Sequence, residues 1–411
     1  MRDALGTVLP DKGDPEALRH LVRAVAEGSA DPADPLCTAH LHCPPLAVAA
    51  AADLAASVLN PSLDSWDQAP AASALETLVT RALANEVYRD LPRGAGNCAT
   101  SPHRPDALVT TGGTESNQLA LLLARETQGP EVRLVCGENA HHSLPRAAWL
   151  LGMPHPVTLP TLDPAALETT LATLQGPLVV AATAGTTDTG QIDPLPEIAH
   201  LCARHRARLH VDAAYGGGLL FSPRHRAKLT GIETAATVTL DLHKLGWQPV
   251  AAGLLAVRDK NDLAALHHRA DYLNADDDTE AGLPDLLGRS LRTTRRPDIL
   301  KIAVTLKTLG REGLGALVDQ VCSTAQEFAE LIDRHPRFEL HTPPTISTVL
   351  FRPAGATDDA VAAVRRQLLE DGRAVLGRAR AANRLWLKIT LLNPTTRPAD
   401  LAGLLTLVEG N

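Results

Sequence analysis

The sequence of 411 residues is long enough for one large domain and a smaller one, each with its own core. Its hydrophobic fraction of 45% and charged fraction of 21% are usual for a globular protein. The net charge of −8 provides no basic field for nucleic acid or anionic lipid, so we expect a soluble protein that acts on a small molecule.

The cysteines contain no Cys-x-x-Cys pair and no close framework, which indicates free thiols in a reducing compartment. No basic and apolar leader opens the chain, and the apolar stretch 46–59 is interrupted by Asp53 and too short to span a bilayer. We therefore expect a cytoplasmic protein. The segment HLHC at 40–43 has no second Cys or His pair at ligand spacing, so no metal is expected.

A helix is predicted over 15–27, and Pro44-Pro45 opens a second, alanine-rich helix. Short apolar, β-branched runs follow at 107–110, 132–136, 178–183, 209–211, 237–240 and 253–257. Helix-period segments separate several of these runs, at 116–125, 144–151 and 195–205. This alternation predicts an α/β fold with a mostly parallel sheet between flanking helices.

The last third of the chain has a different pattern. The polar stretch 267–289 has no apolar period and is expected to be a loop. Helices are predicted over 299–309, 314–332 and 358–371, and strands over 348–351 and 385–391. We expect an N-terminal segment over 1–75, a large domain over 76–298 and a smaller α+β domain over 299–411.

Polar residues end or follow several of the predicted strands. Thr183 ends LVVAAT, Asp212 ends RLHVD, and Lys244 follows VTLDLH directly. In an open parallel sheet, ligands bind beyond the carboxyl ends of the strands. These three side chains are therefore expected to meet at one edge of the sheet.

The segment VTTGGTESN at 109–117 places two glycines between a strand and a helix, with Thr114, Ser116 and Asn117 in the first helical turn. The free N–H groups and the positive end of the helix dipole can bind an anion there. The segment is neither a Walker loop nor a dinucleotide fingerprint, and taken alone an ordinary capped helix explains it equally well.

Asp212 and Lys244 complete a pattern with that helix start. A buried carboxylate needs a cationic partner, and a protonated pyridine nitrogen about 4 Å away would gain about 4 kcal/mol at an effective dielectric constant of about 20. A lysine held in a pocket can form a Schiff base. Each residue alone has an ordinary structural explanation, but the set specifies pyridoxal phosphate, whose ring serves as an electron sink.

The chain resembles the group II pyridoxal-phosphate-dependent amino acid decarboxylases of fold type I from His40 onward. The branch containing L-2,4-diaminobutyrate decarboxylase and the siderophore-pathway lysine decarboxylases is the most similar. Several segments carry the resemblance in combination, namely HCPP, NPSLDSWDQAPAAS, TTGGTESN, AHHSL, TAGTTDTGQIDPL, HVDAAYGG, DLHKLGWQP, TTRRPDILK and LLNPTTR. It implies the fold type I transferase fold, with a large sheet of the seven-stranded type.

The resemblance also implies roles for the catalytic residues. Lys244 would bind the cofactor aldehyde, Asp212 would pair with the pyridinium nitrogen, and His141 would stack on the exposed ring face. Tyr272 would protonate the substrate carbon after carbon dioxide leaves. An exposed loop tyrosine is the ordinary explanation of that residue.

The cofactor-binding residues implied by the resemblance share the same strand and helix ends. Gly113, Thr114 and His243 would hold the phosphate, Ala214 would pack under the ring, and Thr183 would lie beside the ring substituents. Ser116 and Asn117 would take part from the first turn of the helix.

A substrate pocket and a homodimer are also implied. His42, Cys43 and Pro44 would line the pocket entrance, and Trp66 and Gln68 would reach across the dimer interface. Arg296 would lie near the substrate carboxylate, although it is equally understood as a solvated residue at a helix start.

The expected reaction is α-decarboxylation of an L-amino acid, with a basic diamino acid such as 2,4-diaminobutyrate, lysine or ornithine as substrate. Three alternatives remain open at this point: an aromatic amino acid decarboxylase or aldehyde synthase, a fold-related aminotransferase or lyase, and a catalytically silent partner protein that keeps the fold.

Overall fold

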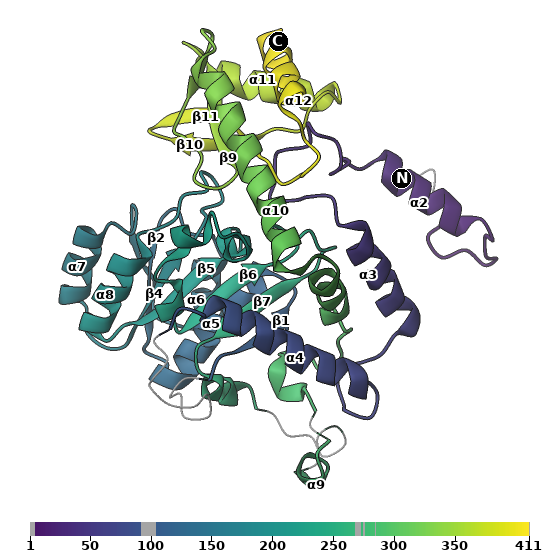
Figure 1. Cartoon of the computed structure of the whole chain (residues 1–411), viewed down its shortest axis with the longest axis vertical. Helices are drawn as coiled ribbons and strands as arrows, with labels where there is room; N and C mark the ends of the chain where they lie inside the picture. Colours follow the sequence, from purple (N-terminus) through teal and green to yellow (C-terminus); the bar gives the residue numbers. More distant parts are fainter. Residues whose placement is uncertain (1–4, 92–103, 268–272, 274–275, 284, 411) are drawn as a thin grey trace.

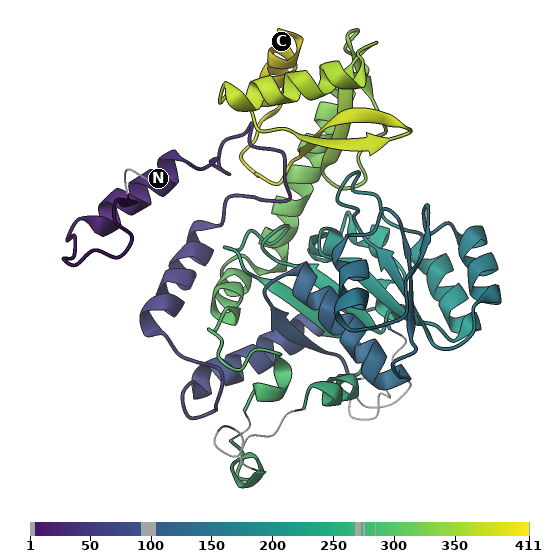
Figure 2. The ribbon, with the colours of Figure 1, turned by 180° about the vertical axis from the view of Figure 1, so that it is seen from behind.

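The computed structural model describes residues 5–91, 104–267, 273, 276–283 and 285–410. A large α/β body carries a smaller domain, and the long helix α10 (Ile299–Asp333) runs from one to the other (Figures 1 and 2). None of the helices in these residues is long and apolar enough to cross a membrane.

The large body is built on a sheet of seven strands in the order β1-β7-β6-β5-β4-β2-β3. Strands β2 to β6 run parallel to one another, and β7 is antiparallel to both β6 and β1. The strands are β1 (Asp106–Thr110), β2 (Arg133–Gly137), β3 (Val157–Leu159), β4 (Leu178–Thr183), β5 (Arg208–Ala213), β6 (Thr237–Asp241) and β7 (Gly253–Val257). The predicted mostly parallel sheet is confirmed, and only the short edge strand β3 was not predicted.

Both faces of the sheet are covered, which explains why its strands are continuously apolar. Val179 and Ala181 of β4 share a buried cluster with helices α5 and α6, whereas Val180 and Ala182 share one with α8 on the opposite face. Successive side chains alternate between the two faces. The covering helices are α5 (Gly113–Gln128), α6 (Ser143–Leu150), α7 (Pro164–Thr173) and α8 (Leu195–His205).

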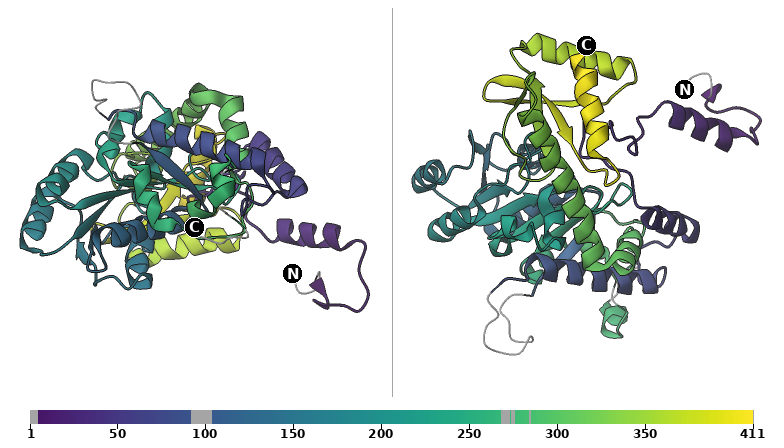
Figure 3. Two further views of the ribbon diagram at one scale, coloured as in Figure 1. Left: turned by 90° about the horizontal axis from the view of Figure 1, so that it is seen from below. Right: turned by 45° about the horizontal axis from the view of Figure 1, so that its top comes forward.

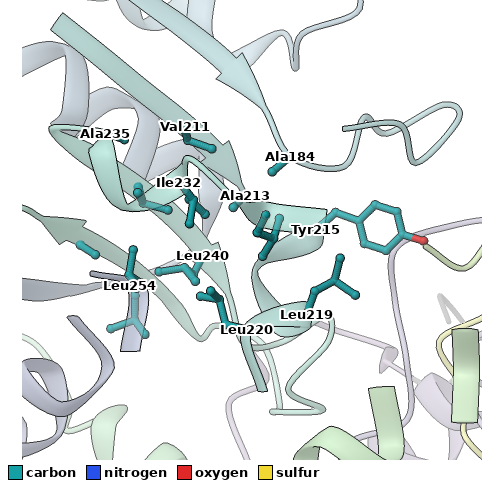
Figure 4. Packing of buried hydrophobic residues seen from close by; sticks show 14 of the residues in the cluster. Ala184, Val211, Ala213, Tyr215, Leu219, Leu220, Ile232, Ala235, Leu240 and Leu254 are labelled. Atoms are coloured by element: carbon teal, nitrogen blue, oxygen red, sulfur yellow. The ribbon is translucent and has the colours of Figure 1, made fainter. Parts of the chain in front are cut away.

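A tight turn follows β5 and packs into the core of the body. The 3₁₀ helix η1 (Gly216–Phe221) contributes Leu219 and Leu220 to the cluster that holds Leu240 and Leu254 (Figure 4). A Cβ at Gly218 would overlap the backbone carbonyl oxygen of Leu245, so glycine is needed for this close approach. The turn fixes the end of β5, where Asp212 lies. Further 3₁₀ turns are η2 (Arg226–Leu229), η3 (Ile232–Thr234), η4 (Lys260–Leu266) and η5 (Leu287–Arg289).

The smaller domain contains a four-stranded antiparallel sheet in the order β10-β11-β9-β8. Its elements are β8 (Phe338–Leu340), β9 (Thr348–Pro353), α11 (Asp358–Glu370), β10 (Gly377–Ala381), β11 (Arg384–Thr390) and α12 (Pro398–Glu409). The two helices predicted over 299–309 and 314–332 are the halves of α10, which is interrupted at Gly310, where φ is +63°. Strands β8 and β10 were not predicted. The division of the chain at residues 75 and 298 remains a prediction.

The N-terminal helices differ in how they pack. Helix α3 (Ala47–Leu59) lies against α10, and α4 (Pro70–Val87) packs on β1 and β7. Helix α2 (Ala17–Glu27) has no buried residue and projects away from the body (Figure 3). Within the predicted loop 267–289, the short helix α9 (Asp276–Glu280) and the turn η5 are the described elements.

One ion pair is completely buried between α4 and the segment that precedes α10. Arg295 donates to both carboxylate oxygens of Glu76 at 2.7 and 2.6 Å, and the two side chains are 1% and 0% exposed. Burying two charges is costly, but removing one partner costs more because the other charge is left without compensation.

The replacement Arg295→Met is therefore expected to lower the free energy of unfolding by about 3–5 kcal/mol. Urea denaturation followed by circular dichroism measures this loss. The neighbouring Arg296→Met is the control, because Arg296 is 42% exposed and its pair with Asp53 contributes about 1 kcal/mol or less. Equal midpoints for the two variants would contradict the assignment.

Candidate active site

A cavity of about 290 Å³ lies where β4, β5 and β6 end and α5 begins. This is the edge of the sheet at which the strand-end residues were predicted to meet. The cavity is lined by eight of the predicted site residues, namely Gly113, Thr114, His141, Thr183, Asp212, Ala214, His243 and Lys244.

Lys244 lies in the turn after β6, and its ammonium group faces a carboxylate. Its Nζ is 3.0 Å from Oδ2 of Asp241, the last residue of β6. Asp241 is only 3% exposed, and its Oδ1 has no hydrogen-bond partner among the described residues. The lysine thus enters the cavity from a buried strand end, where an acid three residues earlier holds it.

Asp212 ends β5 with its carboxylate deep in the cavity wall. Oδ2 accepts a hydrogen bond from Asn117 Nδ2 at 2.8 Å, and Oδ1 accepts one from the Ala214 N–H at 3.0 Å. The side chain is 4% exposed, and within the described residues no cationic side chain lies within ion-pair distance of it. A buried carboxylate with this surrounding favours a positively charged ligand atom beside it.

The start of α5 forms a concave cradle. The first N–H groups of a helix have no partner within the helix, and here they belong to Gly113 and Thr114. A Cβ at Gly113 would lie 3.1 Å from Ala214 Cβ and 3.2 Å from Asp241 Oδ2, and a Cβ at Gly112 would lie 3.0 Å from His243 Cε1. Side chains at these two positions would fill the space that an anion needs.

Two further residues complete the wall. His141 Nδ1 lies 2.8 Å from Ser143 Oγ, and burial lowers the pKa of its imidazole. The Thr183 N–H donates to Asp193 Oδ2 at 2.7 Å, which holds the end of β4 in place. Burial raises the pKa of Asp193 to about 6.

Two residues predicted to contact the cofactor do not line the cavity. Ser116 and Asn117 are fully buried, because their positions on the first turn of α5 face the sheet. Ser116 Oγ bonds with Thr110 Oγ1 at 2.7 Å and donates to the Leu254 carbonyl at 3.1 Å. Asn117 contacts Asp212 from behind. Tyr272 lies outside the described residues, so its role remains a prediction.

None of the six residues predicted for the substrate pocket lines the cavity in this single chain: His42, Cys43, Pro44, Trp66, Gln68 and Arg296. Cys43 contacts a residue of the wall, since its Sγ lies 3.3 Å from the Lys244 carbonyl oxygen. Arg296 pairs with Asp53 at 2.9 Å, which holds its guanidinium against α3.

The sequence reasoning missed several residues of the wall, namely Leu41, Thr111, Gly185, Thr187, Tyr215 and Asp241. Asp241 lies in the segment DLHKLGWQP and Tyr215 in HVDAAYGG, both of which carry the family resemblance. An acidic or aromatic residue at the end of a predicted strand was therefore the feature that could have identified them as wall residues. Lys388 of β11, which contacts the wall residue Thr187 but does not itself line the cavity, was also missed. Its Nζ donates to the Thr187 carbonyl at 3.0 Å, it is 6% exposed, and burial lowers its pKa.

These residues fit pyridoxal phosphate. The helix start and His243 would hold the phosphate, Asp212 would face the ring nitrogen, Lys244 would bind the aldehyde, and the ring would lie between His141 and Ala214. The unpartnered Oδ1 of Asp241 and the uncompensated carboxylate of Asp212 are both consistent with a polar group that occupies the cavity.

Comparisons with known proteins agree with this geometry. The conserved domain of pyridoxal-dependent decarboxylases matches residues 7–354. The L-2,4-diaminobutyrate decarboxylase of Rhizobium meliloti (strain 1021) is 40% identical over 403 residues, which cover 93% of this chain and 79% of that protein. The enzyme of the same name from Acinetobacter baumannii is 33% identical, over 96% of this chain and 83% of its own.

Solved structures give the same result. The glutamate decarboxylase domain of a diaminobutyrate-pyruvate transaminase and L-2,4-diaminobutyrate decarboxylase from Vibrio parahaemolyticus superimposes with a TM-score of 0.83 at 31% identity, covering all of this chain and 88% of that one. An Oryza sativa TDC solved with PLP and tryptamine shares the fold, with a TM-score of 0.90 at 24% identity over all of this chain and 90% of its own. The chain therefore belongs to the pyridoxal-dependent decarboxylase family and is a pyridoxal-phosphate-dependent amino acid decarboxylase.

Proposed function

We propose that the protein releases carbon dioxide from the α-carboxylate of a basic diamino acid, with L-2,4-diaminobutyrate as the first candidate. The observation that carries this proposal is the 40% identity with a diaminobutyrate decarboxylase over 93% of the chain, together with a cavity wall that contains Lys244 and Asp212. Lysine and ornithine, which differ only in side-chain length, are the next candidates.

In the proposed reaction, bound pyridoxal phosphate supplies an electron sink for the electron pair left on the substrate carbon. Lys244 would hold the cofactor aldehyde in the cavity until a substrate amine binds. Asp212 stabilises positive charge at the ring nitrogen, and His141 limits water access to the open ring face. Tyr272 is the proposed proton donor.

Lys388 is proposed to orient the substrate carboxylate. Its ammonium is buried, and its one recorded hydrogen bond goes to the carbonyl of Thr187, which lines the cavity. Asp188 is the acid that influences it, and among the described residues no carboxylate lies within ion-pair distance of its Nζ. A buried ammonium that lacks an ion-pair partner attracts an incoming carboxylate.

A homodimer is also proposed. Leu18, Val22 and Val25 follow one face of α2 and are 79%, 60% and 54% exposed, although nothing in the same chain covers them within the described residues. A helix with such a stripe needs a partner surface, and a second copy of the chain provides one. A cytoplasmic location remains part of the proposal on the sequence observations alone.

A product screen tests the proposed substrate. Purified protein with pyridoxal phosphate is incubated with 2,4-diaminobutyrate, lysine, ornithine and tyrosine, and amine and carbon dioxide are quantified. We expect equal amounts of both products and the highest kcat/KM for a diamino acid. Lys244→Ala is expected to release neither product, and borohydride reduction is expected to attach a pyridoxyl group to Lys244 in the parent protein only. Preference for tyrosine would overturn the substrate class.

The replacement Lys388→Met is expected to lower kcat/KM by roughly tenfold to a hundredfold, because a charge-assisted hydrogen bond to the substrate is lost. Lys388→Arg should retain part of the activity. Lys228→Met is the control, since Lys228 also donates to a carbonyl, that of Thr345 at 2.7 Å, but Thr345, unlike Thr187, does not line the cavity. Steady-state kinetics that are unchanged in Lys388→Met would remove this residue from the site.

The replacement Val22→Glu is expected to shift the protein from dimer to monomer, because it places a charge in the centre of the exposed apolar stripe. Light scattering coupled to size-exclusion chromatography measures the mass. Leu369→Glu on α11, where Leu369 is 45% exposed, is the control and should leave the mass unchanged. A parent protein that is monomeric at micromolar concentration would refute the dimer.

A further inference from the structure

Asn117 lies behind the cavity wall and uses all of its hydrogen-bonding capacity. Its Nδ2 donates to Asp212 Oδ2 at 2.8 Å and to Ser143 Oγ at 2.9 Å. Its Oδ1 accepts from His210 Nε2 at 3.0 Å and from Thr239 Oγ1 at 2.8 Å. An amide offers two N–H donors and two lone pairs, so no group of this buried side chain is left unpaired.

The donor and acceptor roles of the groups that bind the Asn117 amide oxygen can be assigned in only one way. The amide oxygen can only accept, so Nε2 of His210 must carry a proton and the Thr239 hydroxyl must donate. Nδ1 of His210 then accepts from the Thr237 hydroxyl, which lies 2.9 Å away. Burial lowers the pKa of His210 to about 4, which agrees with a neutral ring that holds a single proton. A flipped amide would instead turn its oxygen toward the Asp212 carboxylate.

The donor and acceptor roles can also be assigned for the groups between Asn117 and the cavity. Ser143 Oγ accepts from Asn117, so its one hydroxyl proton is free for His141 Nδ1 at 2.8 Å. The backbone N–H of Ser143 also points at that nitrogen, at 3.3 Å. Nδ1 of His141 is therefore an acceptor, and in the neutral ring the proton is on Nε2.

We propose that Asn117 is a positioning residue that orients two groups of the cofactor site, Asp212 and His141, through one chain of hydrogen bonds. The chain starts at Thr237, His210 and Thr239 and divides at the Asn117 amide. One branch delivers a donor to Asp212, which holds its side chain in place, and the other fixes His141 as the Nε2–H tautomer. The inference about Asp212 rests on the proposed role of that residue, whereas the tautomer of His141 does not depend on the reaction.

This arrangement has a chemical consequence for the site. With Nδ1 occupied by Ser143, the Nε2–H of His141 is the hydrogen-bond donor that the ring can offer to a ligand. The same amide that presents this donor also keeps Asp212 aligned behind the cofactor. A single buried side chain thus links the group above the ring to the group at the ring nitrogen.

The test uses the full-length protein without cofactor, labelled with ¹⁵N-histidine. His141→Gln identifies the His141 signals, and nitrogen chemical shifts report the tautomer. The parent protein is expected to show a protonated Nε2 and an unprotonated Nδ1 at His141. Asn117→Asp, which has nearly the same shape, is expected to lose this preference and to raise the dissociation constant for pyridoxal phosphate by about tenfold or more, because a donor to Asp212 is replaced by an oxygen.

Two further variants keep the proposal testable if Asn117→Asp does not fold. Ser143→Ala should weaken the tautomer preference and leave cofactor affinity within about threefold of the parent, because it cuts only one branch. Thr239→Val, the matched control, removes one of two donors to the amide oxygen and should leave the tautomer unchanged. A parent protein with the Nδ1–H tautomer would overturn the proposal, as would a folded Asn117→Asp with unchanged tautomer and affinity. Failure to decarboxylate the tested amino acids would instead refute the proposed substrate.

Discussion

The burial of the Asp212 carboxylate at the end of β5 governs how its neighbours are arranged. A carboxylate that is 4% exposed and has no described cation in ion-pair distance carries a desolvation cost. The N–H groups of Asn117 and Ala214 offset part of that cost. A cationic ring nitrogen would offset the rest, so a bound cofactor would complete an electrostatic balance that the protein alone leaves open.

The buried ion pair of Glu76 and Arg295 differs from the charges at the cavity, because both of its members are fully paired. Glu76 and Arg295 satisfy each other with two short hydrogen bonds and lie outside the cavity. At the cavity, Asp241 faces Lys244 with one oxygen and has no described partner for the other. Incomplete pairing of buried charges therefore separates the functional site from the structural ion pairs.

Much of the fold and part of the site could be predicted from the sequence. The apolar runs gave the strands, and the convergence of strand ends predicted that Thr183, Asp212 and Lys244 would meet. Lys388 could not be placed in this way, because it reaches the cavity rim across 201 residues from a strand of another sheet. The substrate-pocket residues came from resemblance alone, and none of them is part of the cavity lining in the described residues of the single chain. The expected dimer interface remains a prediction because the structure contains a single chain. The role of Tyr272 remains a prediction because this residue lies outside the described residues.

Tyr215 connects the cavity to the smaller domain. Tyr215 lines the cavity, and its hydroxyl bonds with Ser347 Oγ at 2.9 Å and Thr348 Oγ1 at 3.0 Å, at the start of β9. One wall of the cavity is thus tied to a sheet that has its own core. If the four-stranded sheet loosens first on gradual heating, this wall is released while the seven-stranded sheet is still folded. Retention of the cofactor would then report the melting of the smaller domain rather than that of the domain that binds it.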